Sequence, residues 1–236
     1  MADYITTYSG THFYPTDPKP EDIHITDIAH AHSLICRGNG HVKTFFSVGQ
    51  HCINCALEAD ARGYSSRLIL ACLLHDSSEC YMSDVPRPFK KTLTEYQKQE
   101  EHLLEVIYRW FLGSSLTMEE QEELKKIDDD LLYYDLQELL NESSEREAPA
   151  LHIDLSYNVE PFETIEKKYL QLYYLYQGDV SFERLRKKAR ITSNHVIRQE
   201  ARFITDCYRK AAELKHPEAE KRLEKFVAAF SKYLLF

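Results

Sequence analysis

The sequence predicts an all-α protein. The chain of 236 residues contains only 7 glycines, alternating strand patterns are scarce, and helix-start signals recur along its length. Hydrophobic residues make up 43% of the chain, which is enough to bury a substantial core. We therefore expect a helical bundle in which residues 1–178 form one domain and residues 179–236 form a basic, amphipathic helical extension.

The first two long helices are predicted by their N-terminal signals. Ser47-Val-Gly-Gln50 is a capping box, in which the Ser47 side chain accepts a hydrogen bond from the backbone N–H three residues later. The helix that it begins is expected to run to about Ala61. Ser65 or Ser66 then caps the segment RLILACLLHDSSECY, whose apolar density is typical of a central buried helix.

The later helices are predicted by the same kinds of signal. Two further capping boxes, TEYQ at 94–97 and TMEE at 117–120, are expected to begin a helix that Gly113 ends and a long helix that reaches residue 140. After the polar segment NESSEREAPA, a helix is expected from about 162 to 176, ending at the Gln-Gly pair at 177–178. Two or three amphipathic helices follow it.

The charge of the chain is unevenly distributed. The net charge is −9 overall, but residues 1–178 carry −15 and residues 179–236 carry +6. The acidic part would repel nucleic acid unless a local patch or a metal ion offset its charge, whereas the basic part could contact nucleic acid or another acidic partner. We favour the simpler interpretation that the basic segment packs against its own acidic domain or serves as a dimer arm.

The sequence predicts a soluble, cytoplasmic protein. No stretch approaches the roughly 20 apolar residues of a membrane helix, and MADYITTYSG does not resemble a secretory signal. The six cysteines are scattered and are expected to be small core residues rather than disulfides. Cys52 and Cys55 form one CxxC pair within a helical pattern, which is weak support for a thiolate zinc site.

The stretch HDSSE at the end of the central helix concentrates ionisable groups. On a helix, residues four apart share a face, so we expect His75 and Glu79 to be neighbours, with Asp76 on an adjoining edge. Burying a carboxylate without a partner is costly. The cluster therefore predicts a site that binds a cation or moves a proton.

Other predicted helices offer partners for such a cation. His51 lies one turn into its helix on an otherwise apolar face, and Asp128, Asp129 and Asp130 lie in a helix that continues with leucines, so at least one of the three carboxylates is expected to point inward. A mixed set of imidazoles and carboxylates suits one divalent transition metal ion, namely manganese, iron, cobalt, nickel or zinc, and the sequence does not choose among them.

These residues resemble the HD-domain metal-dependent phosphohydrolases. That family has a His on one helix, an adjacent His-Asp on the next and an Asp on a later one, and these match His51, His75-Asp76 and Asp128. Residues 4–177 resemble in particular the small bacterial and prophage-borne members related to the HD-domain 5′-deoxynucleotidases, which carry HD-x-x-E, an Asp-x-Pro turn and then a Lys. The resemblance implies an HD-type helical bundle that holds one metal ion at the four matched residues.

The resemblance also implies roles around a nucleotide substrate. Glu79 matches a residue that acts as general acid or base, and Asp84 matches an aspartate beside the sugar and the attacking water. Arg37 matches an arginine that holds a phosphate, and Lys90 could add positive charge there. Gly38 stands where the deoxynucleotidases carry a bulky aromatic residue that selects the sugar, so the resemblance does not imply selectivity for deoxyribose.

The expected function is therefore hydrolysis of a phosphate ester of a small nucleotide, with a nucleoside 5′-monophosphate as first candidate. Triphosphohydrolysis of deoxynucleoside triphosphates is the alternative within enzymes, but it should require more Arg and Lys near the site than Arg37 and a few lysines. A different class is a metal-containing binding or regulatory protein whose segment 179–236 grips a partner, with Phe203 and Tyr208 among its basic residues.

Overall fold

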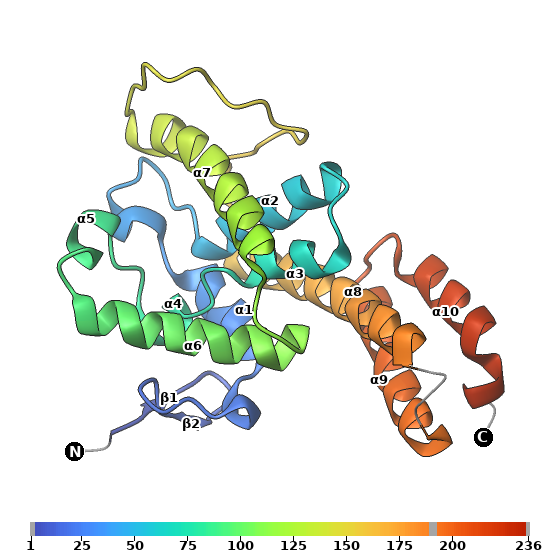
Figure 1. Cartoon of the computed structure of the whole chain (residues 1–236). Coiled ribbons are helices and arrows are strands. Elements are labelled where there is room, and N and C mark those ends of the chain that lie inside the picture. Colours follow the sequence, from blue (N-terminus) through green and yellow to red (C-terminus); the bar gives the residue numbers. More distant parts are fainter. Residues whose placement is uncertain (1–2, 189–192, 235–236) are drawn as a thin grey trace.

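The computed structural model describes residues 3–188 and 193–234 and has an all-α fold, as the sequence predicts (Figure 1). Two short strands near the N-terminus, β1 and β2, pair antiparallel. None of the helices in the described ranges is long and apolar enough to cross a membrane. The elements are β1 Ile5–Thr6, β2 His12–Phe13, η1 Pro20–Asp22, α1 Ile25–Leu34, η2 Arg37–Gly40, α2 Val48–Ala61, α3 Ser66–Leu74, α4 Glu79–Met82, α5 Arg87–Lys90, α6 Thr94–Leu112, α7 Met118–Leu140, α8 Phe162–Lys188, α9 Asn194–Glu213 and α10 Ala219–Leu234.

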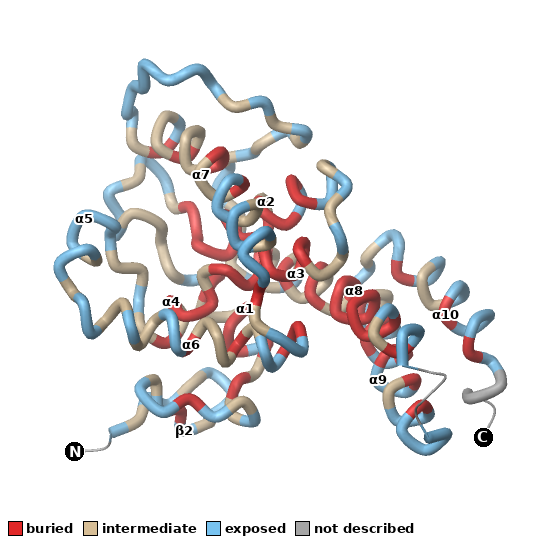
Figure 2. Tube along the Cα trace, viewed as in Figure 1, coloured by how far each residue is buried: buried red, intermediate tan, exposed pale blue. Residues whose placement is uncertain are grey.

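Helix α3 forms the centre of the bundle. Leu70, Leu73 and Leu74 have no exposed surface, which accounts for the apolar density of this segment. The helix packs against α2 and α8 and is also contacted by α6 and α7. Figure 2 shows the buried residues concentrated where these helices meet. Residues that leave the C-terminal end of α3 therefore enter the interior of the protein.

Two of the three predicted capping boxes are present. Ser47 caps α2 and Thr117 caps α7, and in both cases the side chain of the residue three positions later bonds back to the cap. The box predicted at Thr94 is wrong, because Thr94 is already the first residue of α6. The turn after α5 leads directly into this helix, so that Gln97 N–H donates to the carbonyl of Leu93. Gly113 ends α6 in a left-handed conformation, as expected.

The central helix ends earlier than the sequence predicts. Helix α3 stops at Leu74, residues 75–78 form a turn, and the short helix α4 begins at Glu79. Three backbone carbonyl groups in this region accept hydrogen bonds from side chains. The donors are His75 to the Cys72 carbonyl, Tyr169 to the Leu73 carbonyl and His32 to the Asp76 carbonyl. A turn therefore separates His75 from Glu79, and the prediction that they share one helix face is wrong.

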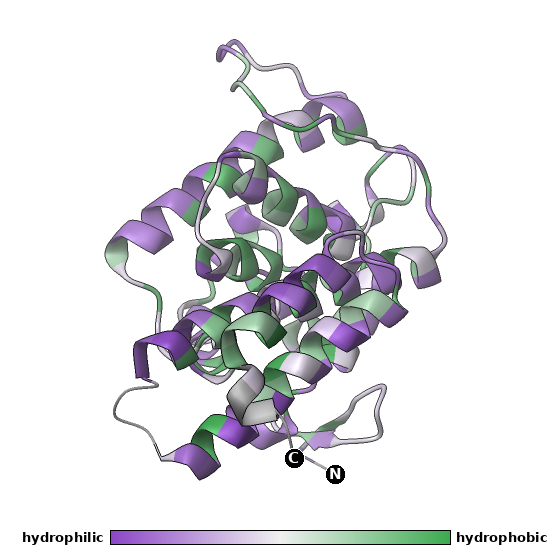
Figure 3. Cartoon of the chain, turned by 90° about the vertical axis from the view of Figure 1, so that its right-hand side faces the viewer, coloured by the Kyte–Doolittle hydropathy of each residue, from purple (hydrophilic) through white to green (hydrophobic). Residues whose placement is uncertain are grey.

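Helix α8 is longer than predicted and crosses the expected boundary at residue 178. Gly178 does not end the helix; a Cβ atom at this position would lie 2.6 Å from Cε1 of Tyr208 on α9, so the glycine allows α8 and α9 to pack closely. Helices α9 and α10 follow, as expected for the extension. Figure 3 shows hydrophilic and hydrophobic stretches alternating along these helices. The division into two domains stays a prediction.

Candidate metal centre

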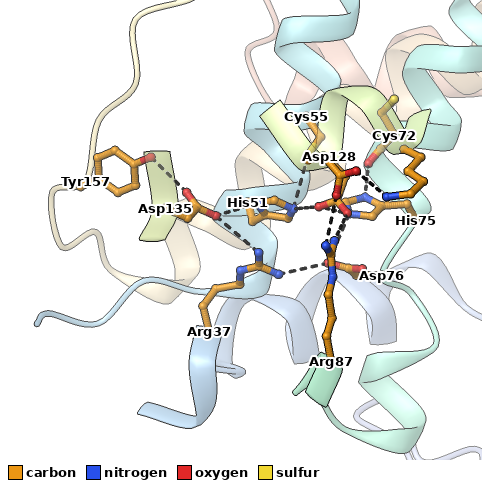
Figure 4. Close-up of polar contacts among 12 residues, drawn as sticks. Arg37, His51, Cys55, Cys72, His75, Asp76, Arg87, Asp128, Asp135 and Tyr157 are labelled. Carbon is orange, nitrogen blue, oxygen red and sulfur yellow. Dashed lines mark hydrogen bonds and ion pairs between the residues drawn. The ribbon is translucent and has the colours of Figure 1, made fainter. Parts of the chain in front are cut away.

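Four side chains from three parts of the chain bring ligand atoms together (Figure 4). His51 comes from α2, His75 and Asp76 from the end of α3 and the turn after it, and Asp128 from α7. His51 Nε2 lies 3.0 Å from Asp128 Oδ1, and His75 Nε2 lies 3.3 Å from Asp76 Oδ2 and 3.8 Å from Asp128 Oδ1. Ligand atoms that each lie about 2.0–2.2 Å from one metal ion are about 3–3.5 Å apart. The distances of 3.0 and 3.3 Å lie within this range, and that of 3.8 Å is slightly longer.

Hydrogen bonds fix the orientation of both imidazoles. Nδ1 of His75 lies 2.7 Å from the carbonyl oxygen of Cys72, to which it can donate, and Nδ1 of His51 lies 2.9 Å from Oδ2 of Asp135. With the proton on Nδ1, each ring presents the lone pair of Nε2 to the cluster. Nε2 of His75 is buried and makes no hydrogen bond to any described residue. A metal ion would satisfy this atom, so the residues present fit the metal that the sequence resemblance implies.

The electrostatics of the cluster favour a cation. Burial alone would lower the pKa of His75, but the negative charge of Asp76, together with the contributions of other acidic neighbours, outweighs it and raises the pKa well above its usual value. Burial alone would likewise raise the pKa of Asp128, but its hydrogen bond to His51 and the positive charges of His51 and His75 hold it well below its usual value. The same negative field that holds protons on the imidazoles attracts a divalent ion, which would displace them.

Two buried thiols border the cluster. Sγ of Cys55 lies 3.5 Å from Nε2 of His51, and potential ligand atoms of His51, Cys55 and His75, and of Cys52, His75 and Asp76, lie within 4.8 Å of one another. Burial raises the pKa of the Cys52 thiol above its usual value. Both cysteines are core residues, as expected, and the position of Cys55 four residues after His51 is the sequence signal that could have indicated its place beside the site.

Arg37 and Asp135 lie around the ligands. Nη1 of Arg37 is 3.4 Å from Oδ2 of Asp76, and Nη2 is 3.4 Å from Oδ2 of Asp135. Asp135 also accepts a hydrogen bond of 3.0 Å from the hydroxyl of Tyr157. Nε2 of His32 lies 3.0 Å from the backbone carbonyl oxygen of Asp76. Burial lowers the pKa of His32 to about 4. Asp135 therefore supports His51 and pairs with Arg37.

A cavity of about 380 Å³ opens above the ligands. Its volume lies within the range of small-molecule sites. The apolar residues that line it include Val42 and the leucines of α7, Leu132, Leu136 and Leu139. Its polar lining includes the predicted catalytic and substrate-binding residues together with two of the predicted metal ligands: Arg37, Asp76, Glu79, Asp84, Lys90 and Asp128.

Glu79 lines this cavity as a buried carboxyl group. Its side chain is 5% exposed, and Oε2 makes no hydrogen bond to any described residue. Burial, together with the negative charges of Asp76 and Asp84, raises its pKa well above the usual value for glutamate. The neutral form is therefore favoured, and the carboxyl group has a proton to donate. Lys90 also lines the cavity, but its ammonium group is 2.7 Å from a carboxylate oxygen of Glu100.

Arg87, which the sequence analysis did not select, reaches the site from α5. Its Nη2 lies 2.7 Å from Oδ2 of Asp128, and its Nη1 lies 3.1 Å from Oδ1 of Asp129 (Figure 4). The signal that could have indicated it is its place in SDVPRP, between two prolines that fix the turn after Asp84. Arg87 also lines the cavity.

No protein-family model matches the chain. Part of it is 38% identical over 104 residues to the uncharacterized protein YfdR of Escherichia coli (strain K12), and 33% identical over 109 residues to the uncharacterized protein RCAP_rcc00048 of Rhodobacter capsulatus. Each match covers 44% of this chain, and 56% and 55% of the respective relative. The chain thus spans little more than half the length of these curated relatives, and neither name states an activity.

Proposed function

We propose that this chain is an HD-domain metal-dependent phosphohydrolase that hydrolyses a phosphate ester of a nucleotide, with a nucleoside 5′-monophosphate as the first candidate substrate. The observation that supports this most strongly is the meeting of two imidazoles and two carboxylates at a cavity lined by an arginine and a buried glutamate whose pKa is raised. Each of these groups serves a separate requirement of phosphate ester hydrolysis.

The proposed metal ligands are His51, His75, Asp76 and Asp128. A divalent ion at this position would lower the pKa of a water molecule and screen the negative charge of the phosphate. Manganese, cobalt, iron, nickel and zinc all suit this donor set. Nε2 of His75 supports a metal in particular, since this buried atom makes no hydrogen bond to a described residue.

Other polar residues that line the cavity act on the substrate. Arg37 offers a planar set of N–H donors that suits a phosphate group, and its side chain is already held by Asp76 and Asp135. Glu79, whose raised pKa keeps its proton, donates it to the departing alcohol oxygen. Asp84 lines the same cavity and accepts hydrogen bonds from a sugar hydroxyl or from the attacking water.

The shape of the cavity favours one small nucleotide. The nucleoside would lie against Val42 and the leucines of α7, whereas the phosphate would lie among the charged residues. A triphosphate would need more cationic groups, and Lys90 is already paired with Glu100. Triphosphohydrolysis therefore remains the second candidate, and it is separated from the first by whether phosphate or a longer polyphosphate is released.

The packing of the C-terminal helices favours a structural role for this segment over a role in binding a partner. The hydrophobic residues Ile197, Ala201, Ile204 and Tyr208 of α9 are buried, and this helix packs against α8 and α10. Burial of this face is what a helical cap on the bundle requires. The binding alternative predicts that the full-length protein retains nucleic acid in a salt-sensitive manner.

The test is release of phosphate from a panel of nucleoside mono- and triphosphates, each with several divalent metals. We expect metal-dependent release by the wild type and loss of release in Asp76→Ala, while Asp154→Ala, which changes an exposed aspartate, retains it. Absence of turnover with every metal in a folded, metal-loaded protein would refute the proposal.

A further inference from the structure

Two arginines approach the proposed metal ligands from different elements of the fold. Arg37 lies in η2, where its Nη1 is 3.4 Å from Oδ2 of Asp76, and Arg87 lies in α5, where its Nη2 is 2.7 Å from Oδ2 of Asp128. Both side chains line the same cavity. Figure 4 shows the two guanidinium groups on the same side of the ligand cluster.

Asp128 divides its two oxygens between different partners. Oδ1 faces the imidazoles of His51 and His75, at 3.0 and 3.8 Å, while Oδ2 faces Arg87. Arg87 is therefore next to the ligand cluster without competing for the atom that would bind a metal. A phosphate oxygen in this cavity would lie within the range of the same guanidinium group.

The contacts of Arg87 leave it able to bind a further anion. Its side chain is 54% exposed, and exposed ion pairs contribute only about 0–1 kcal/mol, so a shift toward a phosphate gives up little stability. A guanidinium group has five N–H donors, and the contacts with Asp128 and Asp129 use two nitrogens of its planar fork. Binding of a dication at Asp128 would also weaken the hold of that carboxylate on Arg87.

Lys90 is the less suitable second cation. It comes from the same short helix and lines the same cavity, but its ammonium group lies 2.7 Å from Glu100, and both side chains are largely buried. Moving Lys90 toward a substrate would leave the carboxylate of Glu100 without this partner in a poorly solvated place. Arg87 can turn to a phosphate without such a loss.

The geometry points to Arg87 as a second arginine that contacts the phosphate of the substrate, opposite Arg37, an assignment that rests on the phosphohydrolase function proposed above. The two guanidinium groups bind different oxygens of one phosphate group, which fixes its orientation as well as its position. The site then selects for a tetrahedral dianion over a carboxylate of similar size.

The experiment is calorimetric titration of inorganic phosphate into the protein loaded with manganese(II) or cobalt(II), together with KM and kcat for a nucleoside 5′-monophosphate. The variants are Arg87→Ala, Arg87→Lys and Arg37→Ala. The matched control is Arg146→Ala, since Arg146 is 59% exposed and also pairs with an aspartate of α7, Asp130, which does not line the cavity. The metal affinity of every variant is measured, and the titrations are made at saturating metal.

We expect Arg87→Ala to weaken phosphate binding by about tenfold, the usual worth of a hydrogen bond to a charged group, and to raise KM more than it lowers kcat. Arg87→Lys should recover part of the loss, and Arg146→Ala should bind within twofold of the wild type. Phosphate binding by Arg87→Ala equal to that of the wild type at saturating metal, with binding lost in Arg37→Ala, overturns the role of Arg87 alone. A metal-loaded wild type that neither binds phosphate nor hydrolyses any phosphate ester overturns the proposed function with it.

Discussion

Oδ2 of Asp135 lies 2.9 Å from Nδ1 of His51, on the side of the ring that faces away from the other ligands. The carboxylate holds the ring in the orientation that presents Nε2, and it raises the basicity of that nitrogen. The same carboxylate accepts a hydrogen bond from Tyr157 and pairs with Arg37. Asp135 therefore connects a proposed metal ligand to a proposed substrate-binding residue.

Asp135→Ala should weaken metal binding by about 10- to 100-fold, because outer partners of ligating histidines contribute effects of that size. The affinity is measured by competition with a chromophoric chelator. Tyr157→Phe, which removes a hydrogen bond to Asp135 and keeps the ring, should have a smaller effect in the same direction. Unchanged affinity in Asp135→Ala would mean that Asp135 does not position His51.

Two capping boxes allow a matched test of how α2 positions its ligand. Ser47→Ala and Thr117→Ala each remove the cap of a helix and should each cost about 1 kcal/mol of unfolding free energy, measured by urea denaturation. His51 lies in the first turn after Ser47, whereas Asp128 lies far from Thr117 along α7. Metal affinity should therefore fall in Ser47→Ala and stay near the wild-type value in Thr117→Ala. Equal effects on metal binding would contradict this explanation.

Glu79 makes the stability of the metal-free protein depend on pH. Its pKa in the folded state is raised by burial and by the charges of Asp76 and Asp84, so at pH values above about 4.3, the usual glutamate pKa, the unfolded state loses this proton first. The stability provided by the neutral carboxyl group is present below that pH and is lost as the pH rises toward the raised pKa.

Glu79→Gln removes the titration and keeps a neutral side chain of similar size. In thermal melts of protein stripped of metal with a chelator, the melting temperature of Glu79→Gln relative to the wild type should therefore increase from pH 5 to pH 8. A difference that is constant across this range would show that Glu79 is ionised in the folded protein.

Gly178→Ala should destabilise the protein by about 1–3 kcal/mol, because the new methyl group would lie 2.6 Å from the ring of Tyr208 and overpacking has costs of this size. A double-mutant cycle with Tyr208→Ala separates this clash from other effects, since the penalty should largely disappear when the ring is absent. Unfolding free energies from urea denaturation provide the four values. If Gly178→Ala costs the same free energy of unfolding in the wild type and in Tyr208→Ala, the penalty does not come from the clash with the ring.

The fold class could be predicted because its signals are local. Apolar periodicity, the Ser47 and Thr117 capping boxes and the scarcity of glycine each report on a few neighbouring residues. The convergence of His51 with Asp128 could be predicted only through resemblance to a known pattern, because the two residues are far apart in the chain and are joined by packing of α2 against α7.

The errors arose where contacts between distant segments decide local structure. The end of α3 depends on side chains from α1 and α8, which no pattern within residues 66–80 contains. Glycine commonly ends a helix, but the role of Gly178 is decided by its close approach to Tyr208 on another helix. Arg87 was overlooked because a charged residue in a proline-rich turn is usually a solvated one, and its carboxylate partners lie on α7.

The turn at residues 75–78 also has a consequence for the order of events during protein synthesis. The carbonyl of Leu73 receives its hydrogen bond from Tyr169, which lies 96 positions later in the chain. The ribosome makes the ligand pair His75-Asp76 first, but a growing chain that ends before Tyr169 lacks the group that completes this end of α3. We therefore expect tight metal capture to follow the docking of α8, so that the nascent chain does not trap an ion in an incomplete site.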